Sequence, residues 1–219
     1  MKGGNIHSRE TLDRAYAGRD WRAYGSVLGG CIAHGAPGPI LDVGAGLGFF
    51  LEVCSRWGVS AVGLEGSEYA IQKAKERWPA VDIRLHDLAL PWPFDQEAFG
   101  VVLFNQTIEH LEPEIAARSL KEALRVLRPG GLLIVNSPCR WDGKASAEAS
   151  HINLYTPSRL RREVQEAGFV RYRARDSAVK VGKRWVQKAV SGIWRLCKAE
   201  RLTASANCLA WKPEALLKE

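Results

Sequence analysis

Short apolar runs alternate with stretches of helical periodicity between residues 40 and 135. The apolar runs, which are typical of buried strands, lie at residues 40–43, 61–64, 83–85, 101–104 and 132–135. Helical patterns fill residues 48–57, 67–78 and 113–127, and the last of them is followed by the stop signal Arg128-Pro129-Gly130-Gly131. Because strands buried on both faces read as continuous apolar runs, this order predicts a mostly parallel sheet with helices on both sides.

Further patterns flank this alternating segment. Residues 5–34 carry helix-compatible patches that predict one or two helices before the first strand. After the fifth run, a helix at 156–167 leads through a glycine into a predicted edge strand at 169–174. A basic amphipathic stretch at 183–200 precedes a final predicted strand at 205–211. These additions bring the predicted sheet to seven strands.

The composition agrees with one folded domain. Hydrophobic residues make up 46% of the 219 residues and charged residues 25%, as in ordinary globular proteins. With no internal repeat and no long linker, we predict a single α/β domain with a doubly wound sheet that binds ligands beyond the carboxyl ends of its strands. Its three parts are expected to be a helical cap at 1–38, a ligand-binding core at 39–176, and a basic helix with the final strand at 177–219.

The chain carries no pattern of a secreted or membrane protein. Its first residues, MKGGNIHSRETLDR, lack the apolar region of a signal peptide, and no long uncharged stretch is free of Gly and Pro. We therefore expect a cytoplasmic protein without a transmembrane segment. The five cysteines form no Cys-x-x-Cys pair, so we expect reduced, mostly buried thiols and assign no metal site. They are Cys31, Cys54, Cys139, Cys197 and Cys208.

The positive charge is concentrated in the last third of the chain. Residues 151–219 hold 15 Lys and Arg against 6 Asp and Glu, whereas residues 1–150 hold 16 against 18. Arg171, Arg173 and Arg175 alternate and are expected to share one face of a strand. Basic residues interleaved with tryptophans bind nucleic acid in some proteins, and the same pattern also suits a helix that packs its apolar side on a sheet. An acidic or phosphorylated small molecule, or an anionic membrane surface, would also suit the charge.

The stretch LDVGAGLGFF places glycines at 44, 46 and 48 between a predicted strand and a predicted helix. Glycine there permits a tight turn, close approach of the backbone to a ligand, and a helix that starts near the sheet. A nicotinamide-binding loop would need a small residue where Phe49 stands, so a dinucleotide is disfavoured. Asp42 lies two residues before the first glycine, where we expect its carboxylate to hold the turn amides and attract a cation.

The segment from Asp42 to Gly48 resembles motif I of the class I S-adenosylmethionine-dependent methyltransferases. Glu65 in VGLEGS and Asp87 in IRLHDLALPWPF match the acids that, in this family, bind the ribose hydroxyls and the adenine amino group. The stretches VVLFNQTIEHLEP and LRPGGLLIVNSP resemble the family's fourth-strand and fifth-strand motifs, so the resemblance covers about residues 40–170. It implies the Rossmann-like methyltransferase fold, with S-adenosylmethionine as cofactor and S-adenosylhomocysteine as product.

Thirteen cofactor-binding residues follow from this resemblance. Leu88 is expected to offer its amide beside the adenine, and Tyr16, in the N-terminal helices, to cover the cofactor. The full set is Tyr16, Asp42, Gly44, Ala45, Gly46, Gly48, Glu65, Gly66, Ser67, Asp87, Leu88, Asn105 and Gln106.

Methyl transfer to oxygen usually needs a base, and histidine is suited to that role near neutral pH. His110 follows the fourth strand, and His151 follows the fifth in SHINLYTP, on a loop that family members use beside the substrate. We predict one of these two as the base and favour His151. His86 is expected to be structural, and residues 140–150 to form part of a substrate lid.

The acceptor is the least determined part of the prediction. Methyltransferases that modify amino groups of DNA or glutamine carry a [DN]-P-P-[YFW] motif, and this chain has Asn105-Gln106-Thr107-Ile108 at that place. Cys139 follows a proline after the fifth strand but lacks the companions of an RNA cytosine methyltransferase. We expect a small-molecule acceptor; an RNA methyltransferase that uses the basic segment and a non-catalytic partner subunit remain alternatives. The oligomeric state stays open.

Overall fold

A computed structural model of the protein describes residues 9, 16–18, 20–175, 177–178 and 203–214. Its strands form one mixed sheet with the order β3-β2-β1-β4-β5-β8-β6, and the short β7 also pairs with β8. The neighbours from β3 to β5 are parallel, whereas β8 is antiparallel to β5, β6 and β7. The strands are β1 (Ile40–Val43), β2 (Ala61–Glu65), β3 (Asp82–Leu85), β4 (Phe99–Asn105), β5 (Leu127–Pro138), β6 (Val170–Ala174), β7 (Ser177–Ala178) and β8 (Thr203–Trp211).

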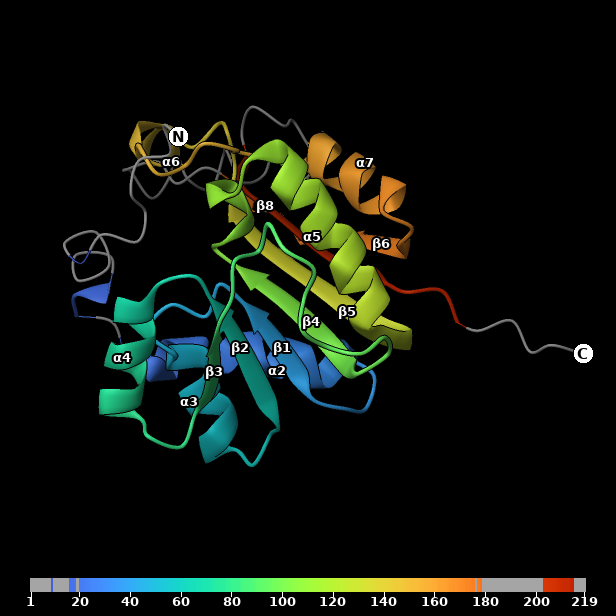
Figure 1. Ribbon diagram of the computed structural model, residues 1–219. Coiled ribbons are helices and arrows are strands. Elements are labelled where there is room, and N and C mark those ends of the chain that lie inside the picture. Colours follow the sequence, from blue (N-terminus) through green and yellow to red (C-terminus); the bar gives the residue numbers. More distant parts are fainter. Residues whose placement is uncertain (1–8, 10–15, 19, 176, 179–202, 215–219) are drawn as a thin grey trace, which may run out of the picture.

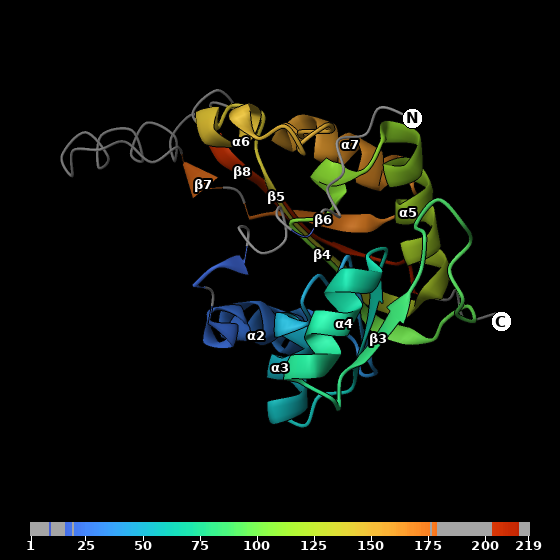
Figure 2. The same ribbon diagram turned by 60° about the vertical axis from the view of Figure 1, so that its left-hand side comes forward.

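Helices cover both faces of this sheet, as Figures 1 and 2 show. Buried side chains of α5 and α7 pack on one face, and those of α2 and α3 pack on the other, while α4 packs beside α3. The helical elements are η1 (Trp21–Tyr24), α2 (Gly25–His34), α3 (Phe49–Arg56), α4 (Glu68–Arg77), η2 (Ile108–His110), α5 (Pro113–Val126), α6 (Gly143–Ala147) and α7 (Pro157–Glu166). The predicted fold class is therefore confirmed.

The alternation of side chains along the strands assigns each residue to a face. In β1, Leu41 and Val43 join the core under α5, whereas Ile40 joins the core under α2 and α3. Asp42 alternates with these residues and therefore faces α2 and α3. A buried carboxylate on the apolar side of a central strand is costly, which indicates that Asp42 has a functional role.

Local signals explain where most helices begin. The Ser67 hydroxyl accepts a hydrogen bond from Ala70 N (3.3 Å) at the start of α4, and the Thr156 hydroxyl accepts one from Arg159 N (3.3 Å) at the start of α7. Proline occupies the first position of α5 and of α7, where its missing N–H costs nothing. Helices α3, α4, α5 and α7 all lie within two residues of the predicted bounds.

Strand β5 begins earlier than predicted. Leu127 pairs with Phe99 across an irregular register, so residues 128–131, expected as a helix stop, lie within the strand. Strand β8 lies between β5 and β6, so the final predicted segment contributes to the same sheet as the core. Arg173 pairs with Leu209 of the α2-side core, and Arg171 stacks over Trp211, which packs on that core.

Two further expectations concern the parts that the structure does not fully cover. Four of the five cysteines are buried, as predicted, and Cys197 lies outside the described residues together with the amphipathic stretch 183–200. None of the helices in the described ranges has the length and hydropathy needed to cross a bilayer.

Candidate active site

The loop after β1 is built from three glycines in the left-handed region, Gly44 (φ 75°), Gly46 (φ 54°) and Gly48 (φ 73°). A Cβ on Gly44 would lie 2.4 Å from Thr107 Cγ2, and one on Gly46 would lie 1.9 Å from the Tyr16 hydroxyl oxygen. Side chains are therefore excluded at these positions both by backbone conformation and by close neighbours. The glycine pattern read from the sequence corresponds to a closely bounded loop.

Glu65, at the end of β2, fixes this loop. Its Oε2 accepts a hydrogen bond from Gly46 N (2.8 Å), and its Oε1 accepts one from Ser67 N (2.9 Å). The carboxylate is 7% exposed, so these bonds act in a nearly dry setting. Glu65 thus joins the first and second βα loops at the edge where the sheet should bind its ligand.

The expectation that Asp42 holds the turn amides is wrong for residues 44, 45, 46 and 48. The amides of Gly44 and Ala45 donate to Leu64 O (2.8 and 3.0 Å), and that of Gly48 donates to Ala45 O (3.0 Å). Asp42 instead lies beneath the loop at 3% exposure. Burial first, and then the negative charge of Glu65, raise the pKa of Asp42 to about 7.

Two cysteines share the environment of Asp42. Burial, and next the charge of Asp42, raise the pKa of Cys31 in α2 to about 12, and the same two causes raise the pKa of Cys54 in α3. Both thiols are therefore neutral. Asp42 therefore has two neutral thiols and the negative charge of Glu65 near it, and a cationic ligand above it would favour its ionised form.

Tyr16, which was predicted to cover the cofactor, lies over the glycine loop. Its ring stacks on Phe49 of α3, with centroids 5.5 Å apart and planes 16° apart. Its hydroxyl is the group closest to the place of a Gly46 side chain.

The residues expected near the adenine lie in the turn after β3. Asp87 is exposed, and its Oδ1 accepts a hydrogen bond from Ala89 N (2.9 Å), which rigidifies the turn that carries Leu88. His86 N donates to Glu65 O (2.9 Å), so this turn is tied to the carboxyl end of β2. Gly66 is exposed, and Ser67 caps α4 through its hydroxyl.

Asn105 and Gln106 face β5. Asn136 Nδ2 donates to Asn105 Oδ1 (3.2 Å), and both the backbone and the side-chain amide of Gln106 donate to Asn136 O (2.8 and 3.2 Å). The neighbour Thr107, which the sequence did not single out, is the one that meets the glycine loop, because its hydroxyl donates to Val43 O (2.8 Å). This contact joins residues 64 positions apart, so no local sequence pattern predicts it.

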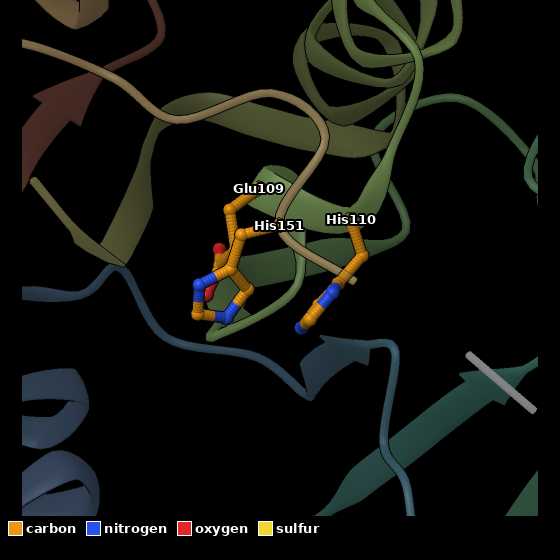
Figure 3. A group of neighbouring side chains, drawn as sticks. All are labelled: Glu109, His110 and His151. Carbon is orange, nitrogen blue, oxygen red and sulfur yellow. The ribbon is translucent and has the colours of Figure 1, made fainter. Parts of the chain in front are cut away.

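His110 and His151 lie together, as Figure 3 shows, with ring centroids 4.9 Å apart. Nδ1 of His110 lies 2.9 Å from Ser150 O, and Nδ1 of His151 lies 2.9 Å from Ala145 O. A carbonyl can only accept, so each Nδ1 carries a proton, and in a neutral ring Nε2 is then the basic nitrogen. The two candidate bases are thus brought to one place.

Glu109, the residue before His110, completes this group and was not assigned a role from the sequence. It is fully buried, and within the described residues neither carboxylate oxygen has a hydrogen-bond partner. Burial raises the pKa of Glu109 to about 7. One donor atom from each of Glu109, His110 and His151 lies within 4.8 Å of those of the other two.

A second network positions the His151 loop. Asn153 N donates to Glu109 O (3.0 Å), and the buried Asn153 side chain donates to the Tyr155 hydroxyl (3.1 Å). Arg159 of α7 donates to Asn153 Oδ1 (2.7 Å) and lies over the Tyr155 ring. In the sequence, the signal available for this anchor was the polar Asn153 in SHINLYTP, which the structure shows to be buried.

These residues fit S-adenosylmethionine. The glycine loop leaves room only for backbone, a nearly buried carboxylate stands at the end of β2, and an unpaired buried carboxylate lies below the loop. A family model described as "Methyltransferase domain" matches residues 13–172, more than half of the chain. The chain belongs to the S-adenosylmethionine-dependent methyltransferases. The family resemblance read from the sequence is therefore confirmed.

Two curated relatives illustrate the similarity. A probable S-adenosylmethionine-dependent methyltransferase from Mycolicibacterium smegmatis is 36% identical over 111 residues, which are 50% of this chain and 42% of that protein. A ubiquinone biosynthesis O-methyltransferase from Bradyrhizobium diazoefficiens is 30% identical over 102 residues, which are 45% of this chain and 39% of that protein. The methyltransferase chain thus matches less than half the length of these relatives.

A solved methyltransferase structure agrees in fold. Phosphoethanolamine N-methyltransferase 2 from Haemonchus contortus, in complex with S-adenosyl-L-methionine, superposes with a TM-score of 0.73 at 15% sequence identity. The similarity covers 96% of this methyltransferase chain and 58% of that one. At this identity the likeness supports the fold.

Proposed function

We propose that the chain transfers the methyl group of S-adenosylmethionine to a hydroxyl oxygen of a small molecule. The observation that carries this proposal is the His110 and His151 pair, with both Nδ1 atoms bonded to backbone carbonyls. Such a pair presents basic nitrogens, which a hydroxyl acceptor requires and a carbon or sulfur acceptor requires less.

Each group of the site has a place in this reaction. The bound cofactor supplies a methyl group already activated by a positively charged sulfur. Glu65 would accept hydrogen bonds from the ribose hydroxyls, Asp42 would provide negative charge near the cationic portion, and Tyr16 would exclude water above the loop. His151, with His110 beside it, takes the proton of the acceptor hydroxyl through Nε2 as the oxygen attacks. Alignment of the two reactants is the larger contribution, of about 7–11 kcal/mol.

One curated relative supports an oxygen acceptor, whereas the structural neighbour described above is an N-methyltransferase. The Bradyrhizobium relative is described as a ubiquinone biosynthesis O-methyltransferase, whose acceptor is an oxygen. Arg171 and Arg173 lie on the α2 side of the sheet, while the remaining basic residues of 180–201 lie outside the described ranges. The proposal of a small acceptor, including an acidic one, therefore rests on the histidine pair and the O-methyltransferase relative and not on the basic segment.

Turnover with a panel of hydroxylated small molecules tests the proposal, with S-adenosylhomocysteine formation as the readout. We expect His151→Ala to slow turnover by about 10²–10⁴-fold, the usual contribution of a general base, while cofactor affinity stays near that of the unchanged chain. His34→Ala, in a histidine at the end of α2, is the matched control and should keep full activity. Methylation of amines only, or full activity of His151→Ala, would overturn the proposed role.

A further inference from the structure

Glu109, His110 and His151 have the composition and spacing of a metal-binding group. Their donor atoms lie within 4.8 Å of one another, although the residues come from two segments, η2 and the loop that follows α6. Figure 3 shows the three side chains converging from these segments. Two imidazoles and one carboxylate are a donor set that first-row divalent metal ions use in proteins.

The hydrogen bonds of the two histidines select the nitrogen that a metal would use. In both rings Nδ1 donates to a backbone carbonyl, Ser150 O for His110 and Ala145 O for His151, each at 2.9 Å. Metal-bound histidines almost always donate their other nitrogen in this way, because the bond fixes the tautomer and the ring orientation. The carbonyls therefore prepare Nε2 of each ring for coordination.

Glu109 supplies the independent observation. A fully buried carboxylate is normally paired or hydrogen-bonded, yet within the described residues neither oxygen has a partner at hydrogen-bonding geometry. The Ser137 hydroxyl and the Glu109 backbone N–H are near enough to stabilise its charge in part, and no cationic side chain of the described residues does so. A bound dication would supply that missing interaction. Donor atoms of His110 and His151 lie within 4.8 Å of the Glu109 carboxylate, so the cation would lie among these three residues.

We propose that Glu109, His110 and His151 bind one divalent transition-metal ion, such as Mn²⁺, Fe²⁺, Co²⁺ or Zn²⁺. The three ligands leave coordination positions for water or for an oxygen of the acceptor. With the ion bound, a coordinated acceptor hydroxyl has a lowered pKa and its proton leaves to solvent; in the ion-free chain His151 takes that proton, as proposed above. This use of the ion rests on the proposed methyl transfer, whereas binding of the ion does not.

Cobalt binding to tag-free protein stripped with chelator tests the site without reference to activity. We expect one Co²⁺ per chain, with visible absorption bands of nitrogen and oxygen ligation. Glu109→Gln and His151→Ala should each weaken binding by at least about tenfold, since even partners of metal ligands contribute that much. His34→Ala should bind as the unchanged chain does, and circular dichroism should show that each variant is folded.

Each outcome decides the matter. Three results would overturn the metal site: no binding up to millimolar Co²⁺, Glu109→Gln and His151→Ala variants that bind as tightly as the unchanged chain, or a thiolate charge-transfer band. If either variant fails to fold, the other carries the comparison, and Zn²⁺ calorimetry of the unchanged chain must still give one site. If the stripped protein methylates acceptors and binds no ion, the metal proposal fails while the proposed function stands. If the protein binds one ion and methylates no acceptor, the metal site stands while the proposed function fails.

Discussion

At the residue scale, two buried carboxylates at neighbouring strand ends have different surroundings. Glu65 accepts hydrogen bonds from two backbone N–H groups and so fixes the glycine loop. The amides of residues 44, 45 and 48 donate to backbone carbonyls and not to Asp42. Asp42 is left beneath the loop, where burial raises its pKa to about 7. The sequence predicted both acids at the site and gave the turn amides to Asp42, whereas in the structure it is Glu65 that accepts from Gly46 N.

Replacement of Asp42 by Asn should make stability less sensitive to pH. The folded chain keeps the Asp42 proton up to about pH 7, whereas the unfolded side chain releases it near 3.8, so the free energy of unfolding falls as pH rises between these values. Asp42→Asn lacks this loss. The stability of Asp42→Asn relative to that of the unchanged chain should therefore be greater at pH 8 than at pH 5 by about 3 kcal/mol in urea unfolding. The same difference at both pH values would contradict the assignment.

Gly46→Ala should separate backbone strain from the close approach of Tyr16. Gly46 and Gly58 both have positive φ, but only the Gly46 side chain would meet another group, the Tyr16 hydroxyl. Both Ala variants should lose about 1–3 kcal/mol of stability from backbone strain. Cofactor affinity should fall only in Gly46→Ala, because Tyr16 is displaced from the loop.

Cofactor titration of the two variants and of Gly46→Ala combined with Tyr16→Phe checks this account. The combined variant removes the hydroxyl that the new methyl group meets, so it should regain part of the lost affinity. Equal affinities of Gly46→Ala and Gly58→Ala would show that Tyr16 does not bound the cofactor site.

At the element scale, α7 positions the loop that carries His151. Arg159 donates to Asn153 Oδ1 (2.7 Å) and forms an ion pair with Glu163 (2.7 Å), and Asn153 N in turn donates to Glu109 O. One helix therefore holds both the histidine loop and the segment after β4. The other two arginines of α7, Arg161 and Arg162, are exposed and do not contribute to this anchor.

Arg159→Ala should destabilise the chain by about 1–3 kcal/mol, since it leaves the buried Asn153 oxygen without its charged donor. It should also slow turnover while cofactor affinity stays unchanged, because the hydrogen bonds of Arg159 go to Asn153, Leu154 and Glu163, which anchor the His151 loop. The matched control is Arg162→Ala, whose ion pair with Glu166 is 64% and 66% exposed and should contribute at most about 1 kcal/mol. Equal stability and turnover of the two variants would refute the anchoring role of Arg159.

The elements themselves were largely predictable from the sequence, and their contacts were not. The pattern at 113–127 became α5 (Pro113–Val126), and the final pattern at 205–211 became β8. Glu109 and Thr107 were missed because their roles come from contacts with segments more than 40 residues away. The start of β5 was missed because Leu127 is drawn into the sheet by pairing with Phe99, which local propensity does not report.

At the scale of the whole molecule, the sheet order explains why these groups meet. Strands β3, β2, β1, β4 and β5 are neighbours and parallel, so the glycine loop, Glu65, the Asp87 turn and η2 all lie at one edge. Helices on both faces bury the rest of the sheet (Figure 1), which leaves that edge for ligands. The cofactor-binding claim depends on this convergence at the glycine loop.

Calorimetric titration of S-adenosylmethionine into the unchanged chain and into Glu65→Ala tests the central claim most directly. We predict binding of one cofactor per chain, weakened in Glu65→Ala by about 1–3 kcal/mol because the ribose and Gly46 N both lose their carboxylate. A folded chain that gives no binding heat, or a Glu65→Ala variant with unchanged affinity, would contradict the account.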